Sequence, residues 1–87
     1  MNQYKKITIN TRSQKAYDNL MNQLESENYC WTTSRQIKSI DIWYKFGRNT
    51  TVTIYQWNKT IAYANLENEF NQKSIQVFKP KDKLEFN

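Results

Sequence analysis

Residues 11–28 read TRSQKAYDNLMNQLESEN, and this stretch predicts one amphipathic helix. Its apolar side chains recur at i, i+3, i+4 and i+7, on one helical face: Tyr17, Leu20, Met21 and Leu24. Thr11 and Gln14 fit a capping box at the start of the helix. Asn28 can take the left-handed conformation that ends a helix where no glycine is present. Such a helix needs an apolar surface to pack against.

Segments on both sides of this helix have the alternating or β-branched pattern of strands. The expected extended segments are residues 4–10, 29–33, 39–46, 51–57, 61–63 and 74–79. Asn58 and Lys59 form a candidate two-residue hairpin turn. Asn65 can cap a short second helix, whose inner face would carry Leu66 and Phe70.

These elements predict an α+β fold. One main helix packs on a largely antiparallel sheet of four or five strands, in the order β-α-β-β-β-α-β, with a short second helix. A chain of 87 residues suffices for one small domain. We assign residues 1–79 to that domain and residues 80–87 to a charged C-terminal tail.

The charge balance favours an anionic partner. Thirteen Lys and Arg residues against eight Asp and Glu residues give a formal net charge of +5. The positive charges are dispersed along the chain, which is the pattern of a solvated surface with a modest cationic excess. The excess argues against a protein that imitates DNA with a carboxylate surface.

The sequence lacks the residues that most catalytic and metal-binding sites use. The chain has no histidine, one cysteine and one glycine, so an imidazole base, a Cys/His metal cluster and a phosphate-binding glycine loop are excluded. The carboxylate pairs Glu25/Glu27 and Glu67/Glu69 have i, i+2 spacing, so their side chains diverge on a helix. We therefore expect no enzymatic activity, no cofactor and no metal.

The single cysteine and the hydropathy pattern indicate in which cellular compartment the protein works. Cys30 lies between Tyr29 and Trp31, where a free cysteine packs as a small hydrophobe. No apolar run approaches the roughly 20 residues of a membrane span, and the N-terminus lacks the pattern of a signal peptide. We expect a cytoplasmic protein, in a bacterial host, with no membrane partner.

Aromatic and cationic residues gather in two neighbouring segments and form the candidate contact face. Its members are Trp43, Lys45, Phe46, Arg48, Tyr55 and Trp57. Trp, Tyr and Arg are enriched at protein-binding hot spots. If Val52 and Ile54 face the helix, Tyr55 and Trp57 face away from it, and exposed rings call for a cover. We expect a partner protein to cover these rings, and a second copy of the chain would be the simplest such partner.

The same six residues support other interpretations. Rings interleaved with cations are also typical of single-stranded nucleic-acid binding, in which bases stack on the rings. The rings can equally be core residues or cross-strand pairs of a small sheet. A structural component of a phage particle is a third alternative.

The order of motifs resembles small phage and prophage proteins of low-GC Gram-positive bacteria. The residues that carry the resemblance are Ile7-Thr8-Ile9-Asn10-Thr11, Leu20 and Leu24, Tyr29-Cys30-Trp31, Asn49-Thr50 and Ile61-Ala62-Tyr63-Ala64. It covers about residues 5–78, with Asn28 at a position where such proteins commonly have glycine. The class has no general function and no functional residues to transfer. The resemblance implies a protein that binds one host protein and alters it, with CRISPR and other defence components among the targets.

We therefore expect a non-enzymatic phage or prophage interaction protein that binds and inhibits a host protein or complex, nucleoproteins included. The anti-CRISPR proteins are one such group. The alternative is a small basic protein that binds single-stranded nucleic acid.

Overall fold

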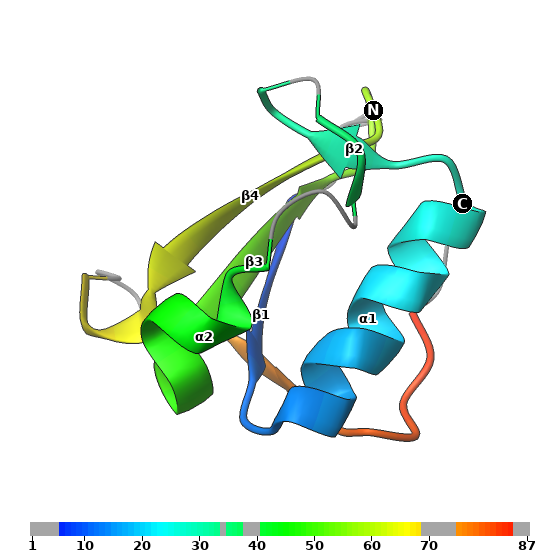
Figure 1. Cartoon of the computed structure of the whole chain (residues 1–87). Coiled ribbons are helices and arrows are strands. Elements are labelled where there is room, and N and C mark those ends of the chain that lie inside the picture. Colours follow the sequence, from blue (N-terminus) through cyan, green and yellow to red (C-terminus); the bar gives the residue numbers. More distant parts are fainter. Residues whose placement is uncertain (1–5, 34, 38–40, 69–74, 85–87) are drawn as a thin grey trace.

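The computed structural model describes residues 6–33, 35–37, 41–68 and 75–84 (Figure 1). Its strands are β1 (Lys6–Thr11), β2 (Cys30–Trp31), β3 (Thr50–Tyr55), β4 (Thr60–Asn65) and β5 (Gln76–Phe78). Its helices are α1 (Gln14–Ser26), α2 (Trp43–Phe46) and the short 3-10 turns η2 (Gly47–Asn49) and η3 (Leu66–Asn68). The α+β class is confirmed, with α1 lying against one face of a five-stranded sheet.

The sheet is mixed, with the strand order β2-β4-β3-β1-β5. β3 is antiparallel to both of its neighbours, β1 and β4. The outer pairs, β1 with β5 and β2 with β4, are parallel. β3 therefore runs against the other four strands, and the expected antiparallel character holds for the centre of the sheet. β1 and β2 run in the same direction because the connection between them, through α1, is a crossover rather than a hairpin.

The apolar face of α1 packs against the three central strands. Its four predicted inward residues and Ala16 are buried, and Leu20 and Leu24 are completely inaccessible. They meet side chains on one side of the sheet: Ile9 from β1, Val52 and Ile54 from β3, and Ile61 from β4. Each fully buried aliphatic side chain contributes about 1.5–3 kcal/mol, so this layer supplies most of the stability.

The start of α1 differs from the expected capping box. Ser13 is the N-cap, and its Oγ accepts a 3.2 Å hydrogen bond from the amide of Ala16. Thr11 is instead the last residue of β1, where it pairs with Phe78 of β5. Strand pairing thus overrides the local cap signal of Thr11. The end of α1 is as predicted, because Asn28 takes a φ of 66°.

Residues 39–46 were expected to be extended, and the described part of that segment forms a helix instead. Asp41 Oδ1 accepts a 3.0 Å hydrogen bond from the amide of Trp43 just before α2. Ile42 is buried and Phe46 packs against the core, which is the i, i+4 spacing of one helical face. Tyr44, between them, is 82% exposed. The buried residues of this short segment therefore follow the spacing of a helix, and the prediction of a strand from the alternating pattern is wrong. Ser39 and Ile40 lie outside the described residues.

The hairpin and the last elements are close to expectation. Four residues, Gln56 to Lys59, join β3 to β4 in place of the expected two, and Lys59 takes a φ of 56°. Asn65 Oδ1 accepts a 3.1 Å hydrogen bond from the amide of Glu67 at the start of η3. Phe70, expected on the inner face of this second helix, lies outside the described residues.

The described part of the C-terminal tail is docked along α1. The side-chain amides of Asn19 and Gln23 each donate a 2.8 Å hydrogen bond to the carbonyl of Asp82. Gln23 Oε1 accepts a 2.8 Å bond from the amide of Leu84, and the Leu84 side chain packs against the core. The folded unit thus continues beyond residue 79, the boundary assigned from the sequence, to Leu84.

Candidate functional site

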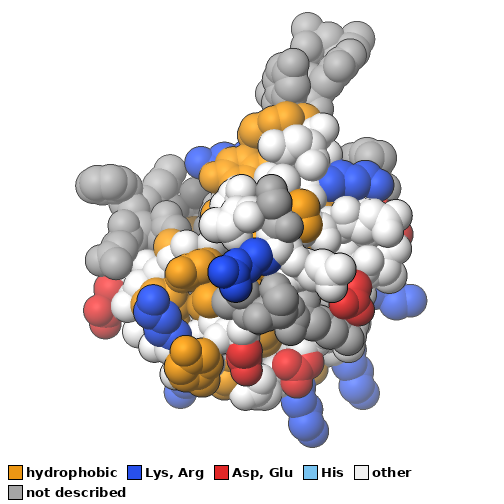
Figure 2. Space-filling model, turned by 45° about the horizontal axis from the view of Figure 1, so that its top comes forward, with side chains coloured by type: hydrophobic (Ala, Val, Ile, Leu, Met, Phe, Trp, Pro, Cys, Tyr) orange, Lys and Arg blue, Asp and Glu red, His pale blue; other side chains and the backbone are white. Residues whose placement is uncertain are grey.

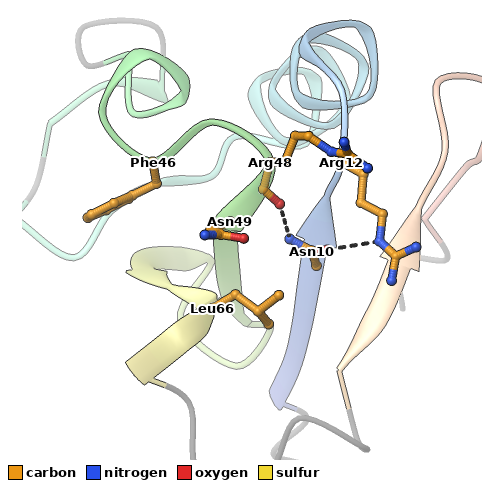
Figure 3. Close-up of a pocket in the computed structure, with 6 residues that line it drawn as sticks. All are labelled: Asn10, Arg12, Phe46, Arg48, Asn49 and Leu66. Atoms are coloured by element: carbon orange, nitrogen blue, oxygen red, sulfur yellow. Dashed lines mark hydrogen bonds between the residues drawn. The ribbon is translucent and has the colours of Figure 1, made fainter.

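An open hollow of about 500 Å³ lies where β1, η2 and η3 meet (Figure 3). We call it the arginine hollow, and it is lined by Asn10, Arg12, Phe46, Arg48, Asn49 and Leu66. Two guanidinium groups and two amides supply its polar wall. Phe46 and Leu66 supply its apolar wall. Such a mixture of a few polar groups with apolar sides is typical of a binding site.

Asn10 holds the polar wall in place. Its side chain is 2% exposed, and Nδ2 donates to the carbonyls of Arg48 at 3.0 Å and Thr50 at 2.9 Å. Its Oδ1 accepts a 3.3 Å bond from Nε of Arg12 (Figure 3). One buried amide therefore ties the end of β1 to η2 and orients a guanidinium.

A sharp turn brings Arg48 beside Arg12. Gly47 follows α2 with a φ of 55°, a left-handed conformation that costs glycine little and strains other residues. The chain then enters β3, whose antiparallel pairing with β1 sets Thr51 opposite Asn10. The only glycine of the chain thus directs Arg48 and Asn49 to the hollow.

The arginine hollow is cationic. No carboxylate lines it, and within the described part of the chain neither Arg12 nor Arg48 forms an ion pair. A planar guanidinium donates two parallel hydrogen bonds to a carboxylate or a phosphate. The hollow is therefore suited to an anionic group carried by a larger partner.

A second cluster joins rings and a cation on the same side of the sheet as α1. The rings of Phe46 and Tyr63 lie 5.9 Å apart, and those of Trp31 and Tyr63 lie 5.8 Å apart, edge to face. Lys45 Nζ is 5.5 Å from the Phe46 ring and 5.8 Å from the Tyr63 ring. Because Phe46 also lines the arginine hollow, this ring cluster and the hollow are continuous.

The six residues of the expected contact face do not form one surface. Phe46 and Arg48 line the arginine hollow, and Lys45 lies over the ring cluster. Trp43 is half-buried, with its ring 6.2 Å from that of Tyr17 on α1, so it belongs to the packing of α2.

Tyr55 and Trp57 pair at 5.2 Å at the other end of β3. That strand has six residues and spans about 20 Å, which separates this pair from the hollow. Alternation does place Tyr55 on the opposite face from buried Ile54, as expected, while Trp57 stands in the turn, 46% exposed. None of these rings forms a cross-strand pair among the described residues, whereas Trp43 and Phe46 pack against the core.

Sequence reasoning missed four members of the hollow: Asn10, Arg12, Asn49 and Leu66. Asn10 and Asn49 are 39 residues apart, and only strand pairing brings them together. The available signal was the single glycine directly before Arg48-Asn49, which marks a forced change of chain direction.

The described residues carry no other concentrated chemistry. They hold no group of three or more metal-ligating side chains, and none of their helices is long and apolar enough to cross a membrane. Burial raises the pKa of the Tyr17 and Tyr29 hydroxyls, both of which belong to the core. On the face shown in Figure 2, Lys and Arg side chains stand apart from one another among hydrophobic, neutral and acidic ones.

Comparison of the chain with protein-family models, with curated proteins and with solved structures finds no match.

Proposed function

We propose that this protein is a non-enzymatic interaction protein that binds another protein through the arginine hollow and inhibits it. One observation carries the proposal: Arg12 and Arg48 meet at an open hollow that no described carboxylate lines. A surface Asp or Glu of a partner fits this arrangement, because a guanidinium binds a carboxylate through two parallel bonds. Charge complementarity of this kind also speeds association.

The resemblance to phage and prophage proteins supports a host partner. Host defence complexes, CRISPR effectors among them, are the first candidates. A small chain that covers a working surface of a larger complex inhibits it by occlusion, which requires no catalytic group.

Binding of single-stranded nucleic acid is the second candidate, and the position of Phe46 supports it. The ring forms a wall of the hollow beside two guanidinium groups, and a base can stack on it while phosphates meet the cations. Single-strand sites generally use several successive rings, however. Tyr55 and Trp57 lie at the far end of β3, and this separation favours the protein partner.

The test replaces both arginines in two ways. The Arg12→Gln/Arg48→Gln variant removes the charges, and the Arg12→Lys/Arg48→Lys variant keeps them without the planar fork. Lys81→Gln/Lys83→Gln is the matched control, because these lysines lie beside the C-terminal half of α1. Bacterial lysate is passed over each immobilised protein, and retained proteins are identified by mass spectrometry. Labelled single-stranded oligonucleotide is titrated in parallel at about 50 and 200 mM salt.

A protein partner predicts one retained protein that both arginine variants lose and the control keeps, with at least a tenfold drop in affinity. Loss in the lysine variant follows because a point charge does not replace bidentate pairing. Micromolar oligonucleotide binding that the lysine variant keeps and that weakens steeply with salt favours nucleic acid instead. Equal retention by all variants contradicts a role for the hollow.

A further inference from the structure

Four of the six residues of β4 have no neighbouring strand on one side among the described residues. β2 has two residues and pairs only with Thr60 and Ile61, at one end of β4. Residues 62–65 continue past it, and the described residues provide no strand beside them (Figure 1). This edge is about 13 Å long, enough for four residues of an extended chain.

Backbone alternation shows which groups face outward at this edge. The carbonyls of Lys59 and Ile61 accept hydrogen bonds from the amides of Cys30 at 3.1 Å and Thr32 at 2.9 Å, on the β2 side. Alternate residues of a strand direct their backbone groups to the same side, so the N–H and C=O of Tyr63 also face outward. Neither group has a hydrogen-bond partner on that side among the described residues. An open donor and acceptor at a sheet edge can pair with another chain.

A second hollow, of about 260 Å³, adjoins this edge. It is lined by Trp31, Thr32, Thr33, Arg35, Ala62 and Tyr63. Trp31 is buried and its ring meets that of Tyr63, which is 41% exposed. A side chain of an added strand can enter this hollow, whose lining includes two aromatic residues and Arg35.

The charges beside the edge are positive. Arg35 lines the hollow, and Lys45 lies 5.8 Å from the Tyr63 ring. Neither side chain forms an ion pair with any residue that the structure describes. These cations complement an acidic chain. They oppose a second copy, since pairing of two β4 edges would bring each cation close to those of its mate.

We propose that the β4 edge binds an extended acidic segment of a partner protein by strand addition. Main-chain hydrogen bonds to Tyr63 would supply affinity, and the cations and the hollow would select the side chains. The inference rests on the proposed function in that the partner is a protein. The ring cluster joins the edge to the arginine hollow, so one partner can occupy both.

The probe is a fluorescein-labelled hexapeptide of alternating Glu and Val, titrated by anisotropy into the full-length protein. Two further probes are the alternating Lys and Val peptide and a Glu-Val peptide methylated at all of its amide nitrogens, which cannot donate backbone hydrogen bonds from either edge. We expect binding of the first peptide alone. Two-dimensional ¹⁵N NMR of the complex should show its largest shifts at Tyr63 and its neighbours in β4, with slower hydrogen exchange of the Tyr63 amide.

Charge reversal identifies the surface. Arg35→Glu/Lys45→Glu should weaken Glu-Val binding at least tenfold, and the matched control Lys81→Glu/Lys83→Glu should leave the affinity within about twofold. Circular dichroism verifies that each variant is folded. Because the arginine-hollow variants are tested separately, failure there leaves the peptide result interpretable.

Three outcomes would overturn the proposal. One is the absence of Glu-Val binding at about 1 mM peptide. Another is binding that survives amide methylation, or that shifts Tyr55 and Trp57 instead of β4. The last is concentration-dependent self-association in sedimentation velocity with the same β4 shifts, which assigns the edge to a second copy.

Discussion

At the scale of single residues, two buried polar side chains hold together segments that are distant in sequence. Asn10 bonds to the carbonyls of Arg48 and Thr50 and thereby shapes the arginine hollow. The hydroxyl oxygen of Tyr17 accepts a 3.1 Å hydrogen bond from the amide of Ile42, which ties α1 to the chain entering α2. Buried polar groups generally have such partners, because an unpaired group keeps its full desolvation cost.

The Tyr17 contact predicts a stability change and a pH dependence. Tyr17→Phe leaves the Ile42 amide without its acceptor, so unfolding free energy at pH 7 should fall by about 1–3 kcal/mol. Burial, the largest cause, raises the Tyr17 pKa above 10.0, against the lowering effect of the Ile42 hydrogen bond. A raised pKa means that the folded state holds the proton more tightly, so its contribution is intact below pH 10 and is lost as pH rises above it.

Urea unfolding of both proteins between pH 8 and pH 11 checks this prediction. The wild type should lose more stability above pH 10 than Tyr17→Phe does. Tyr44→Phe, at an 82% exposed side chain, is the control and should keep the wild-type profile. Parallel alkaline losses in wild type and Tyr17→Phe would contradict the assignment.

For two buried threonines we expect the opposite effect of substitution, a rise in the free energy of unfolding. Thr11 and Thr50 are fully buried, and neither hydroxyl has a hydrogen-bond partner among the described residues. Valine has the same shape without the polar atom, so Thr50→Val should raise unfolding free energy by about 1 kcal/mol. Thr53→Val is the comparison, because the Thr53 hydroxyl lies 3.3 Å from that of Thr8 and loses that bond. A lower thermal midpoint for Thr50→Val than for wild type would show that its hydroxyl is satisfied.

At the scale of elements, the short ones define the surfaces. β2 ends after two residues and leaves the rest of β4 uncovered, while α2 and η2 carry Phe46 and Arg48 to the arginine hollow. The C-terminal segment has no regular structure after β5, yet side chains of α1 hold it through Gln23 and Asn19. Elements this short are stable only through their tertiary contacts.

Substitution of Gln23 tests whether its hydrogen bonds hold the C-terminal segment against α1. Gln23→Ala removes both the donor to the Asp82 carbonyl and the acceptor for the Leu84 amide. The 3.0 Å bond from Gln23 Nε2 to Asn19 Oδ1 is lost as well, so we expect a loss of about 1–3 kcal/mol in unfolding free energy. Hydrogen exchange of the Leu84 amide should accelerate more than that of amides in β3. Gln14→Ala, whose side chain bonds only to exposed Asp18, should change neither quantity appreciably.

At the scale of the whole molecule, one face of the sheet carries the core, and the opposite face carries small side chains together with Tyr55. Alternation places Thr8, Thr53 and Ala62 on the face away from α1, in register with one another across three strands. Asn10 and Thr51 follow the same alternation and are buried, so part of this face is covered. The partner surfaces that we propose lie at the η2 end and along the β4 edge.

The sequence by itself determined α1, the inward residues of β1, β3 and β4, and the α+β class. These features follow from local periodicity, which depends on neighbours within a few positions. It misassigned residues 41–46, because four or five residues satisfy a two-residue and a helical period equally well. It also grouped Phe46 and Arg48 with Tyr55 and Trp57, although β3 stands between the two pairs.

Only the tertiary structure decided the strand order, the arginine hollow and the uncovered edge of β4. Arg12 and Arg48 become neighbours through the pairing of β1 with β3, and the edge exists because β2 stops after Trp31. Both depend on contacts between segments tens of residues apart. Such contacts are selected by the packing of the whole chain and leave no periodic trace in the sequence.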